Sequence, residues 1–138
     1  MTDRTGRCLC GDVRFSFRGP LNWQGHCHCE SCRRASSAPM TSFLGVPDGQ
    51  WEWTGKTPAT YESSPGVRRL FCPRCGSQVA YEADQFPGEI HFYAATLDQP
   101  EAFAPTFHVF AAEAVSWLEI DDDLPRYSGM LGTPKISG

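Results

Sequence analysis

Seven cysteines in three clusters constrain this chain more than any other feature of its sequence. They fall into a pair, a triplet and a second pair: Cys8 and Cys10; Cys27, Cys29 and Cys32; Cys72 and Cys75. Two pairs supply the four thiolates that close a tetrahedral zinc site, whereas a triplet leaves one coordination position open. The pattern therefore predicts one structural metal site and one site that can take an exchangeable ligand.

Length and composition are those of an ordinary globular protein. With 138 residues, 41% of them hydrophobic, the chain can bury a core of its own, and we expect one domain at residues 1–127 with an irregular tail at 128–138. The start of the sequence has no apolar stretch typical of a signal peptide, and no apolar run is long enough to span a bilayer. We expect a cytoplasmic protein whose thiols stay reduced, and the odd cysteine count favours metal ligands over disulfides.

The charge pattern argues against nucleic acid as a partner. The formal net charge is -4, and the basic residues never run beyond the pairs Arg33-Arg34 and Arg68-Arg69. The acidic run Asp121-Asp122-Asp123 is expected to be a solvated turn.

Short stretches of alternating apolar and polar residues predict a mainly β protein with little helix. Strands are expected at residues 13–17, 40–46, 51–53, 59–62, 67–71, 78–82, 89–95, 107–111 and 115–120. The region of the triplet shows little strand pattern, and residues 31–35 could form one short helical turn. Because long crossover helices are absent, the sheets are expected to be antiparallel.

The first and last cysteine pairs are expected to bind one zinc ion together. Cys72 and Cys75 resemble a zinc knuckle, in which a following glycine, Gly76, provides backbone freedom. A redox pair is the alternative, but that motif usually joins a strand to a helix, and here strands are expected on both sides. Cys8 and Cys10 would face one side of an extended segment; otherwise they are two small buried residues.

The triplet can place three sulfurs around a second ion. An iron–sulfur cluster is an alternative, although it would need a fourth cysteine. His26 and His28 are candidate fourth ligands, and the simpler expectation is that both are exposed loop histidines. Arg33 and Arg34 follow directly and could bind the carboxylates of an anionic thiol, unless they are merely solvated.

In combination these motifs resemble the glutathione-dependent formaldehyde-activating family, which includes the centromere protein V group. The resembling segments are 8–15, 26–34 and 71–77, followed by Thr96-Leu97-Asp98, Pro105, His108 and Trp117. One departure is Ser36-Ser37-Ala38-Pro39, because the family usually has a Gly-Ala-Pro-like turn after the triplet.

The resemblance implies small coiled antiparallel β-sheets around a structural zinc site. It implies structural zinc at Cys8, Cys10, Cys72 and Cys75, and a second, catalytic and exchangeable zinc at Cys27, Cys29 and Cys32. The implied activity is that of a carbon–sulfur lyase that joins glutathione, or another small thiol, to formaldehyde. The alternative is a non-catalytic zinc-binding or interaction module in which both metal sites are structural, with one or two zinc ions per chain in either case.

Overall fold

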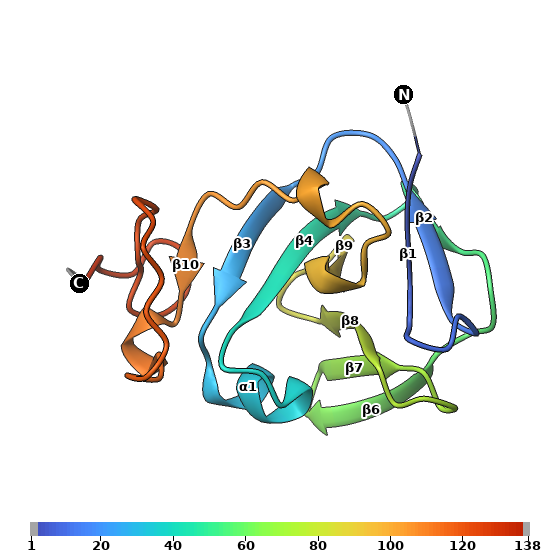
Figure 1. Ribbon diagram of the computed structural model, residues 1–138, viewed down its shortest axis with the longest axis horizontal. Helices are drawn as coiled ribbons and strands as arrows, with labels where there is room; N and C mark the ends of the chain where they lie inside the picture. The colour runs from blue at the N-terminus through green and yellow to red at the C-terminus, as the bar shows by residue number, and fades with distance from the viewer. Residues whose placement is uncertain (1–2, 137–138) are drawn as a thin grey trace. The chain divides into compact units, whose positions relative to one another are not determined.

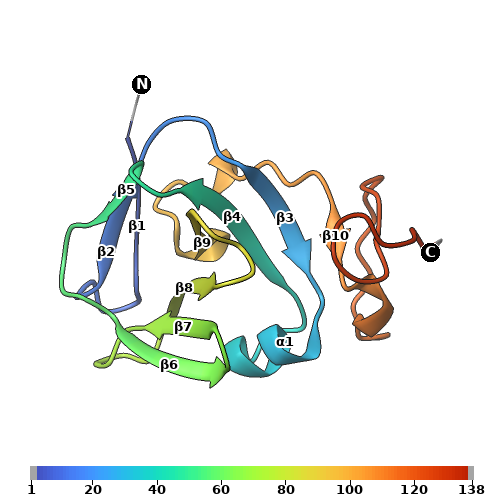
Figure 2. The same ribbon diagram turned by 180° about the vertical axis from the view of Figure 1, so that it is seen from behind.

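Strands make up most of the regular structure in the computed structural model, which describes residues 3–136 (Figures 1 and 2). Helix is confined to α1 (Glu30–Ser36) and three short 3-10 helices, Ala94–Thr96, Pro100–Ala102 and Ala111–Glu113. The expected mainly β architecture with little helix is confirmed. None of the described helices has the length and apolar character needed to cross a membrane.

The chain divides into two compact units. The first contains residues 3–23 and Leu44–Phe103, and the second contains Gln24–Phe43 and residues 104–136. The sequence-based division into a domain at 1–127 and a tail at 128–138 stays a prediction.

Two antiparallel arrangements build the first unit. One sheet has the order β1 (Arg4–Arg7), β2 (Arg14–Phe17), β5 (Trp51–Trp53). The other arrangement is a run of antiparallel neighbours in the order β6 (Ala59–Ser64), β7 (Val67–Phe71), β8 (Gln78–Ala83), β9 (Glu89–Tyr93). β4 (Thr41–Pro47) is the neighbour of β9 in the sheet order, and its residues from Leu44 onward belong to this unit. β6 and β7, which correspond to the strands expected at 59–62 and 67–71, pair as an antiparallel hairpin.

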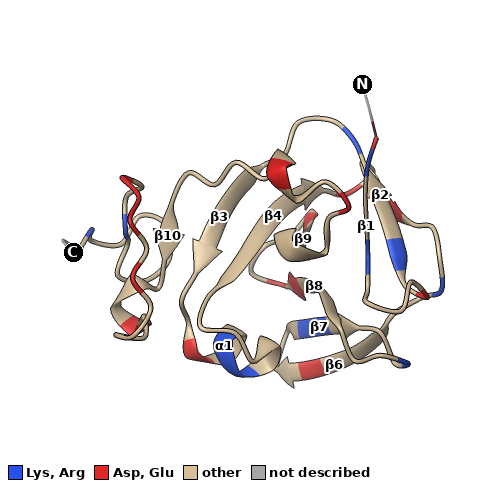
Figure 3. Cartoon of the chain, in the orientation of Figure 1, with Lys and Arg blue, Asp and Glu red and all other residues tan. Residues whose placement is uncertain are grey.

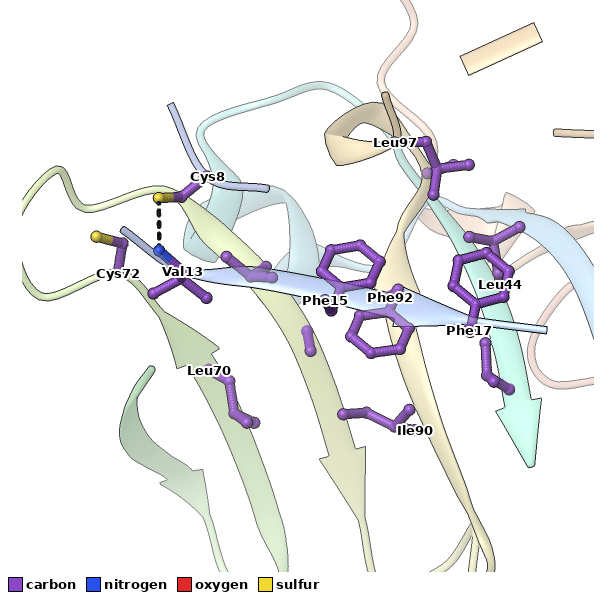
Figure 4. Packing of buried hydrophobic residues seen from close by; sticks show 14 residues of the cluster. Cys8, Val13, Phe15, Phe17, Leu44, Leu70, Cys72, Ile90, Phe92 and Leu97 are labelled. Carbon is purple, nitrogen blue, oxygen red and sulfur yellow. Dashed lines mark hydrogen bonds between the residues drawn. The ribbon is translucent and has the colours of Figure 1, made fainter. Parts of the chain in front are cut away.

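Aromatic side chains form the centre of this unit's core. Phe15 and Phe92 are fully buried, and their rings stack with centroids 3.9 Å apart (Figure 4). Cys8 and Cys72 belong to the same buried cluster and lie beside Val13 at one end of it. The predicted strand alternation of Phe15 and Phe17 is thus the inward face of β2.

In the second unit, β3 (Trp23–Cys27) and β10 (His108–Val109) pair in parallel. The expectation of antiparallel sheets is wrong for this pair. His108 lies opposite His26 and Val109 opposite Cys27, so the register brings a late histidine beside the triplet's strand. Gly25 makes close packing possible, since a Cβ atom there would lie 2.3 Å from the Phe107 ring.

Several strand boundaries differ from the sequence-based expectations. β1 and β3 were not expected, because neither Arg4–Arg7 nor Trp23–Cys27 shows a regular alternation of apolar residues. The strand expected at 107–111 is reduced to two residues, since Phe110 adopts a left-handed φ of 54° before a 3-10 helix begins. Residues 94–95 are helical rather than extended. Within the described chain no strand forms at 115–120, and Trp117 there is 72% exposed.

Candidate metal centres

The first and last cysteine pairs meet in the first unit. The four sulfurs of Cys8, Cys10, Cys72 and Cys75 all lie within 4.8 Å of one another. The Cys8–Cys10 and Cys10–Cys72 Sγ distances are both 3.7 Å. Thiolates that surround one zinc ion at about 2.3 Å lie roughly 3.8 Å apart in a tetrahedron. The four sulfurs therefore fit one zinc ion.

Two tight turns orient these sulfurs. After β7, the Cys75 N–H donates to Cys72 Sγ at 3.4 Å, and the Gly76 N–H donates to the Cys72 carbonyl at 2.8 Å. Gly76 has a φ of 81°, a conformation that glycine adopts without strain. After β1, the Val13 N–H donates to Cys8 Sγ at 3.3 Å. Backbone N–H groups thus point at both buried sulfurs, as thiolates require.

The two accessible thiols of this group differ: against the lowering effect of the Asp12 backbone, burial and contact with Cys8 raise the pKa of Cys10 to about 11, whereas Cys75 favours the thiolate form. The Ser77 hydroxyl, 3.1 Å from Cys75 Sγ, is the main cause that lowers the pKa of Cys75 to about 5. Backbone N–H groups act in the same direction. Because zinc binds thiolates rather than thiols, this shift favours metal binding at neutral pH.

The triplet forms a second sulfur group in the second unit. Cys27 ends β3, Cys29 is the N-cap residue of α1, and Cys32 lies in the first turn of α1. Their sulfurs lie within 4.8 Å of one another. The Cys32 N–H donates to Cys29 Sγ at 3.4 Å. The spacing Cys-x-Cys-x-x-Cys works because an extended segment turns directly into a helix, and this transition aims all three sulfurs at one point.

Contacts within the triplet shift the pKa values of Cys29 and Cys27 in opposite directions. Contact with the Cys27 thiol is the largest cause that lowers the pKa of Cys29 to about 2, followed by contact with Cys32. Correspondingly, the pKa of Cys27 is raised, chiefly by its contact with Cys29. The Ser31 hydroxyl, 3.5 Å from Cys29 Sγ, adds to the stabilisation of the thiolate.

No fourth His, Cys, Asp or Glu of residues 3–136 joins the three triplet sulfurs. The expectation that His26 and His28 are exposed loop residues is wrong. His28 is only 6% exposed, and its Nε2 lies 2.8 Å from His108 Nδ1. His26 is partly buried, with Nδ1 2.8 Å from Ser42 Oγ.

The two arginines after the triplet differ in their surroundings. Arg34 is exposed, and its Nε makes an ion pair with Glu30 at 2.9 Å across one turn of α1. Arg33 is partly buried, and its Nε is buried without a hydrogen-bond partner in the described chain. Figure 3 shows the basic residues on α1 and an acidic residue at its start. Of the two, Arg33 has the guanidinium whose hydrogen-bonding capacity is less used.

Ser37 replaces the glycine that the family resemblance leads one to expect after the triplet. It ends α1 with φ 57° and ψ 30°, a left-handed conformation that favours glycine. The turn therefore keeps a glycine-like backbone path although the residue is serine.

A third group of ligand-type side chains was missed by the sequence interpretation. His26, His108 and Asp122 place one ligand atom each within 4.8 Å of the others. His108 Nε2 lies 2.9 Å from Asp122 Oδ2, and Arg126 lies 3.1 Å from Asp122 Oδ1. Asp122 is thus an engaged residue rather than part of a solvated acidic turn. The only sequence signal was a histidine in a short apolar strand followed by an acidic run, and neither is specific.

Comparisons with known proteins show which family the chain resembles. The family described as glutathione-dependent formaldehyde-activating enzyme, GFA, matches residues 3–113. A Halomonas elongata protein named "Putative glutathione-dependent formaldehyde-activating enzyme" is 26% identical over 84% of this chain and 80% of its own length. An uncharacterized lyase of Schizosaccharomyces pombe is 30% identical over 59% of this chain and 58% of its own length.

A solved Rhodobacter sphaeroides protein has a similar fold, with a TM-score of 0.57 and 19% identity, covering 68% of this chain and 87% of that one. The family match includes all seven cysteines and covers most of the chain. The chain belongs to the glutathione-dependent formaldehyde-activating family.

Proposed function

We propose that the chain is a carbon–sulfur lyase that joins a thiol, with glutathione as the leading candidate, to a small aldehyde such as formaldehyde. The observation that carries the proposal is the triplet of converging sulfurs, which lacks a fourth ligand in the described chain. Membership of the family supports it, as do the relatives named as a formaldehyde-activating enzyme and as a lyase.

The two cysteine groups would hold two zinc ions in unequal roles. Cys8, Cys10, Cys72 and Cys75 would bind a structural ion, because four thiolates leave no open position. Cys27, Cys29 and Cys32 would bind the second. Zinc held by three thiolates keeps one position for a soft fourth ligand, and its quenched charge suits the capture of a thiol better than the activation of water.

The residues around the triplet would bind and orient the thiol substrate. Cys29 is held as a thiolate by the neighbouring thiols and the Cys32 N–H, whereas Cys27, whose pKa is raised by its contact with Cys29, would lose its proton on metal binding. Arg33 would bind a glutathione carboxylate, because its Nε is buried and otherwise without a hydrogen-bond partner in the described chain. Arg34 would contribute less, since Glu30 already pairs with it.

The reaction requires little further chemistry from the protein. The substrate thiol loses its proton, and its sulfur forms a bond to the carbonyl carbon of the aldehyde. The carbonyl π electrons move to the oxygen, which takes up a proton. The product is a hemithioacetal, S-hydroxymethylglutathione in the case of formaldehyde, and the atoms of thiol and aldehyde are all retained. The contribution of the site is to hold sulfur and carbonyl carbon together in place of a bimolecular encounter.

Exchange spectroscopy with carbon-13-labelled formaldehyde and glutathione tests the proposal. The adduct also forms without protein, so the quantity to measure is the rate of exchange between free and sulfur-bound formaldehyde at equilibrium. Wild-type protein should raise this rate well above the protein-free rate, and Cys29→Ser should abolish the increase. Glu52→Gln, a change at an exposed position in β5, is the matched control and should behave as wild type.

If zinc-replete wild type gives only the protein-free rate with glutathione and with other small thiols, the lyase proposal is wrong. The non-catalytic zinc module would then be the better account.

A further inference from the structure

We propose that His26, His108 and Asp122 form a third metal site, which binds a divalent transition-metal ion through two imidazoles and one carboxylate. The site lies in the second unit and shares no ligand with either cysteine group. The proposal is independent of the lyase function.

The geometry of the three side chains fits one ion. Their ligand atoms lie within 4.8 Å of one another, and the His108 Nε2–Asp122 Oδ2 distance is 2.9 Å. The His26 and His108 ring centroids are 4.8 Å apart, with 31° between the ring planes. Two imidazoles bound to one ion at about 2.1 Å, with about 90–110° between them, place their centroids roughly 4.6–5.3 Å apart. The observed separation lies in this range.

Each ligand is held by a second contact on its other polar atom. His26 Nδ1 lies 2.8 Å from Ser42 Oγ, and His108 Nδ1 lies 2.8 Å from His28 Nε2. Asp122 Oδ1 accepts from the Leu124 N–H at 3.1 Å and from Arg126 at 3.1 Å. Such contacts fix ring orientation and tautomer in protein metal sites and tune the ligands. With an ion bound, both Nδ1 atoms would carry the proton and donate it to Ser42 and His28.

The backbone holds the two histidines next to each other. They are direct partners in the parallel pairing of β3 and β10. His108 is further fixed because its N–H donates to the Pro125 carbonyl and its carbonyl accepts from the Tyr127 N–H, both at 2.9 Å. The His108 side chain is fully buried, whereas the Asp122 side chain is 26% exposed, so an ion could enter from the side of Asp122.

The donor set selects the class of ion. Two nitrogens and one oxygen suit zinc, cobalt, nickel or ferrous iron. Magnesium and calcium prefer sites made of oxygen alone, and cuprous copper prefers sulfur. Three protein ligands leave positions for water. The competing account is a simple hydrogen bond from His108 to Asp122 with no ion.

Cobalt(II) added to wild-type protein that carries two zinc ions per chain tests the proposal, because the thiolate groups bind those two ions in preference to the histidine–aspartate group and zinc is diamagnetic. We expect one further cobalt ion per chain, with visible absorption but no sulfur-to-cobalt charge transfer. Proton NMR in water should show two strongly shifted imidazole N–H signals that disappear in deuterium oxide. These signals report two histidine ligands directly and need no variant.

Asp122→Asn should weaken cobalt binding at least tenfold, and His26→Gln should remove one of the two shifted N–H signals. Asp121→Asn and Asp123→Asn make the same charge change at exposed neighbours and should leave binding unchanged. Ser42→Ala should weaken binding by about tenfold, the usual size of an outer-contact effect. No cobalt uptake, or uptake without the two imidazole signals, would overturn the proposal.

Discussion

The two cysteine groups use the same donor atom in opposite surroundings. In the first unit, Cys8 and Cys72 are 1% and 0% exposed and belong to the hydrophobic core around Phe15 and Phe92. In the second unit, the triplet lies at the junction of a five-residue strand and a seven-residue helix. The group of four cysteines is thus part of the hydrophobic core, whereas the position of the triplet depends on the short segment where β3 leads into α1.

We expect this contrast to separate stability from reactivity. A closed set of four thiolates inside a core contributes its binding free energy to folding, because the site does not exist in the unfolded chain. An open set of three can gain or lose its ion without disturbing such a core, and its vacant position is available to a substrate. Substitutions in the two groups and in the core test this contrast.

Cys72→Ser should have the largest effect. It removes one thiolate from the closed group and places a hydroxyl at a fully buried position. We expect a loss of stability of at least about 5 kcal/mol, seen as the loss of a cooperative thermal transition by circular dichroism. A melt within a few degrees of wild type would show that this group is not structural.

Phe92→Ala should come next. Phe92 is fully buried and stacks on Phe15, so truncation leaves a cavity in the core and should cost about 3–5 kcal/mol in urea unfolding. The variant should still hold zinc at the closed group in native mass spectrometry. Tyr61→Ala, at a side chain that is 63% exposed in β6, is the control and should change stability by less than about 1 kcal/mol.

Cys29→Ser should lower stability much less than Cys72→Ser. We expect a folded protein with a cooperative melt that has lost one zinc ion by plasma emission analysis, together with thiol binding. If Cys29→Ser and Cys72→Ser unfold to the same extent, the division into a structural and a reactive group is wrong.

Arg33→Ala should weaken glutathione binding by about tenfold or more, because a charge-assisted hydrogen bond contributes about 1.5–3 kcal/mol. Arg34→Ala should have a smaller effect, since Arg34 is exposed and paired with Glu30. Isothermal titration of both variants with glutathione, and with uncharged mercaptoethanol as the control ligand, checks this. Equal effects of either variant on both ligands would show that neither arginine binds a carboxylate.

The pH dependence of glutathione binding should follow the thiol of the ligand. Binding as thiolate releases one proton, so the apparent affinity should rise about tenfold per pH unit up to roughly pH 8.5 and then level off. A flat profile between pH 6 and 8 would show that glutathione binds as the thiol or away from the triplet.

Much of this contrast could be predicted from the sequence. Each of the pairs Cys8/Cys10 and Cys72/Cys75 belongs to one tight turn next to a strand. Local spacing is therefore sufficient to predict that the two sulfurs of each pair lie close together. The triplet is likewise local, since all its sulfurs lie within six residues. The core strand β2 could be predicted because Phe15 and Phe17 alternate with Arg14 and Ser16.

The histidine–aspartate group could not be predicted in the same way. It requires the parallel register of β3 and β10, and these two strands are far apart in the sequence. β3 itself gives little signal, because Gln24, Gly25 and His26 interrupt any apolar pattern. The need for glycine at position 25 only becomes evident from its contact with Phe107. Long-range register, rather than residue type, determines this part of the molecule.

The central claim is that the triplet has an open coordination position and the other cysteine group does not. The most direct test is the absorption spectrum of cobalt-substituted protein during titration with glutathione. The account predicts that sulfur-to-cobalt charge transfer increases by the contribution of one added thiolate in wild type, and that Cys29→Ser shows no increase. A wild-type spectrum that stays unchanged at saturating glutathione would contradict the account.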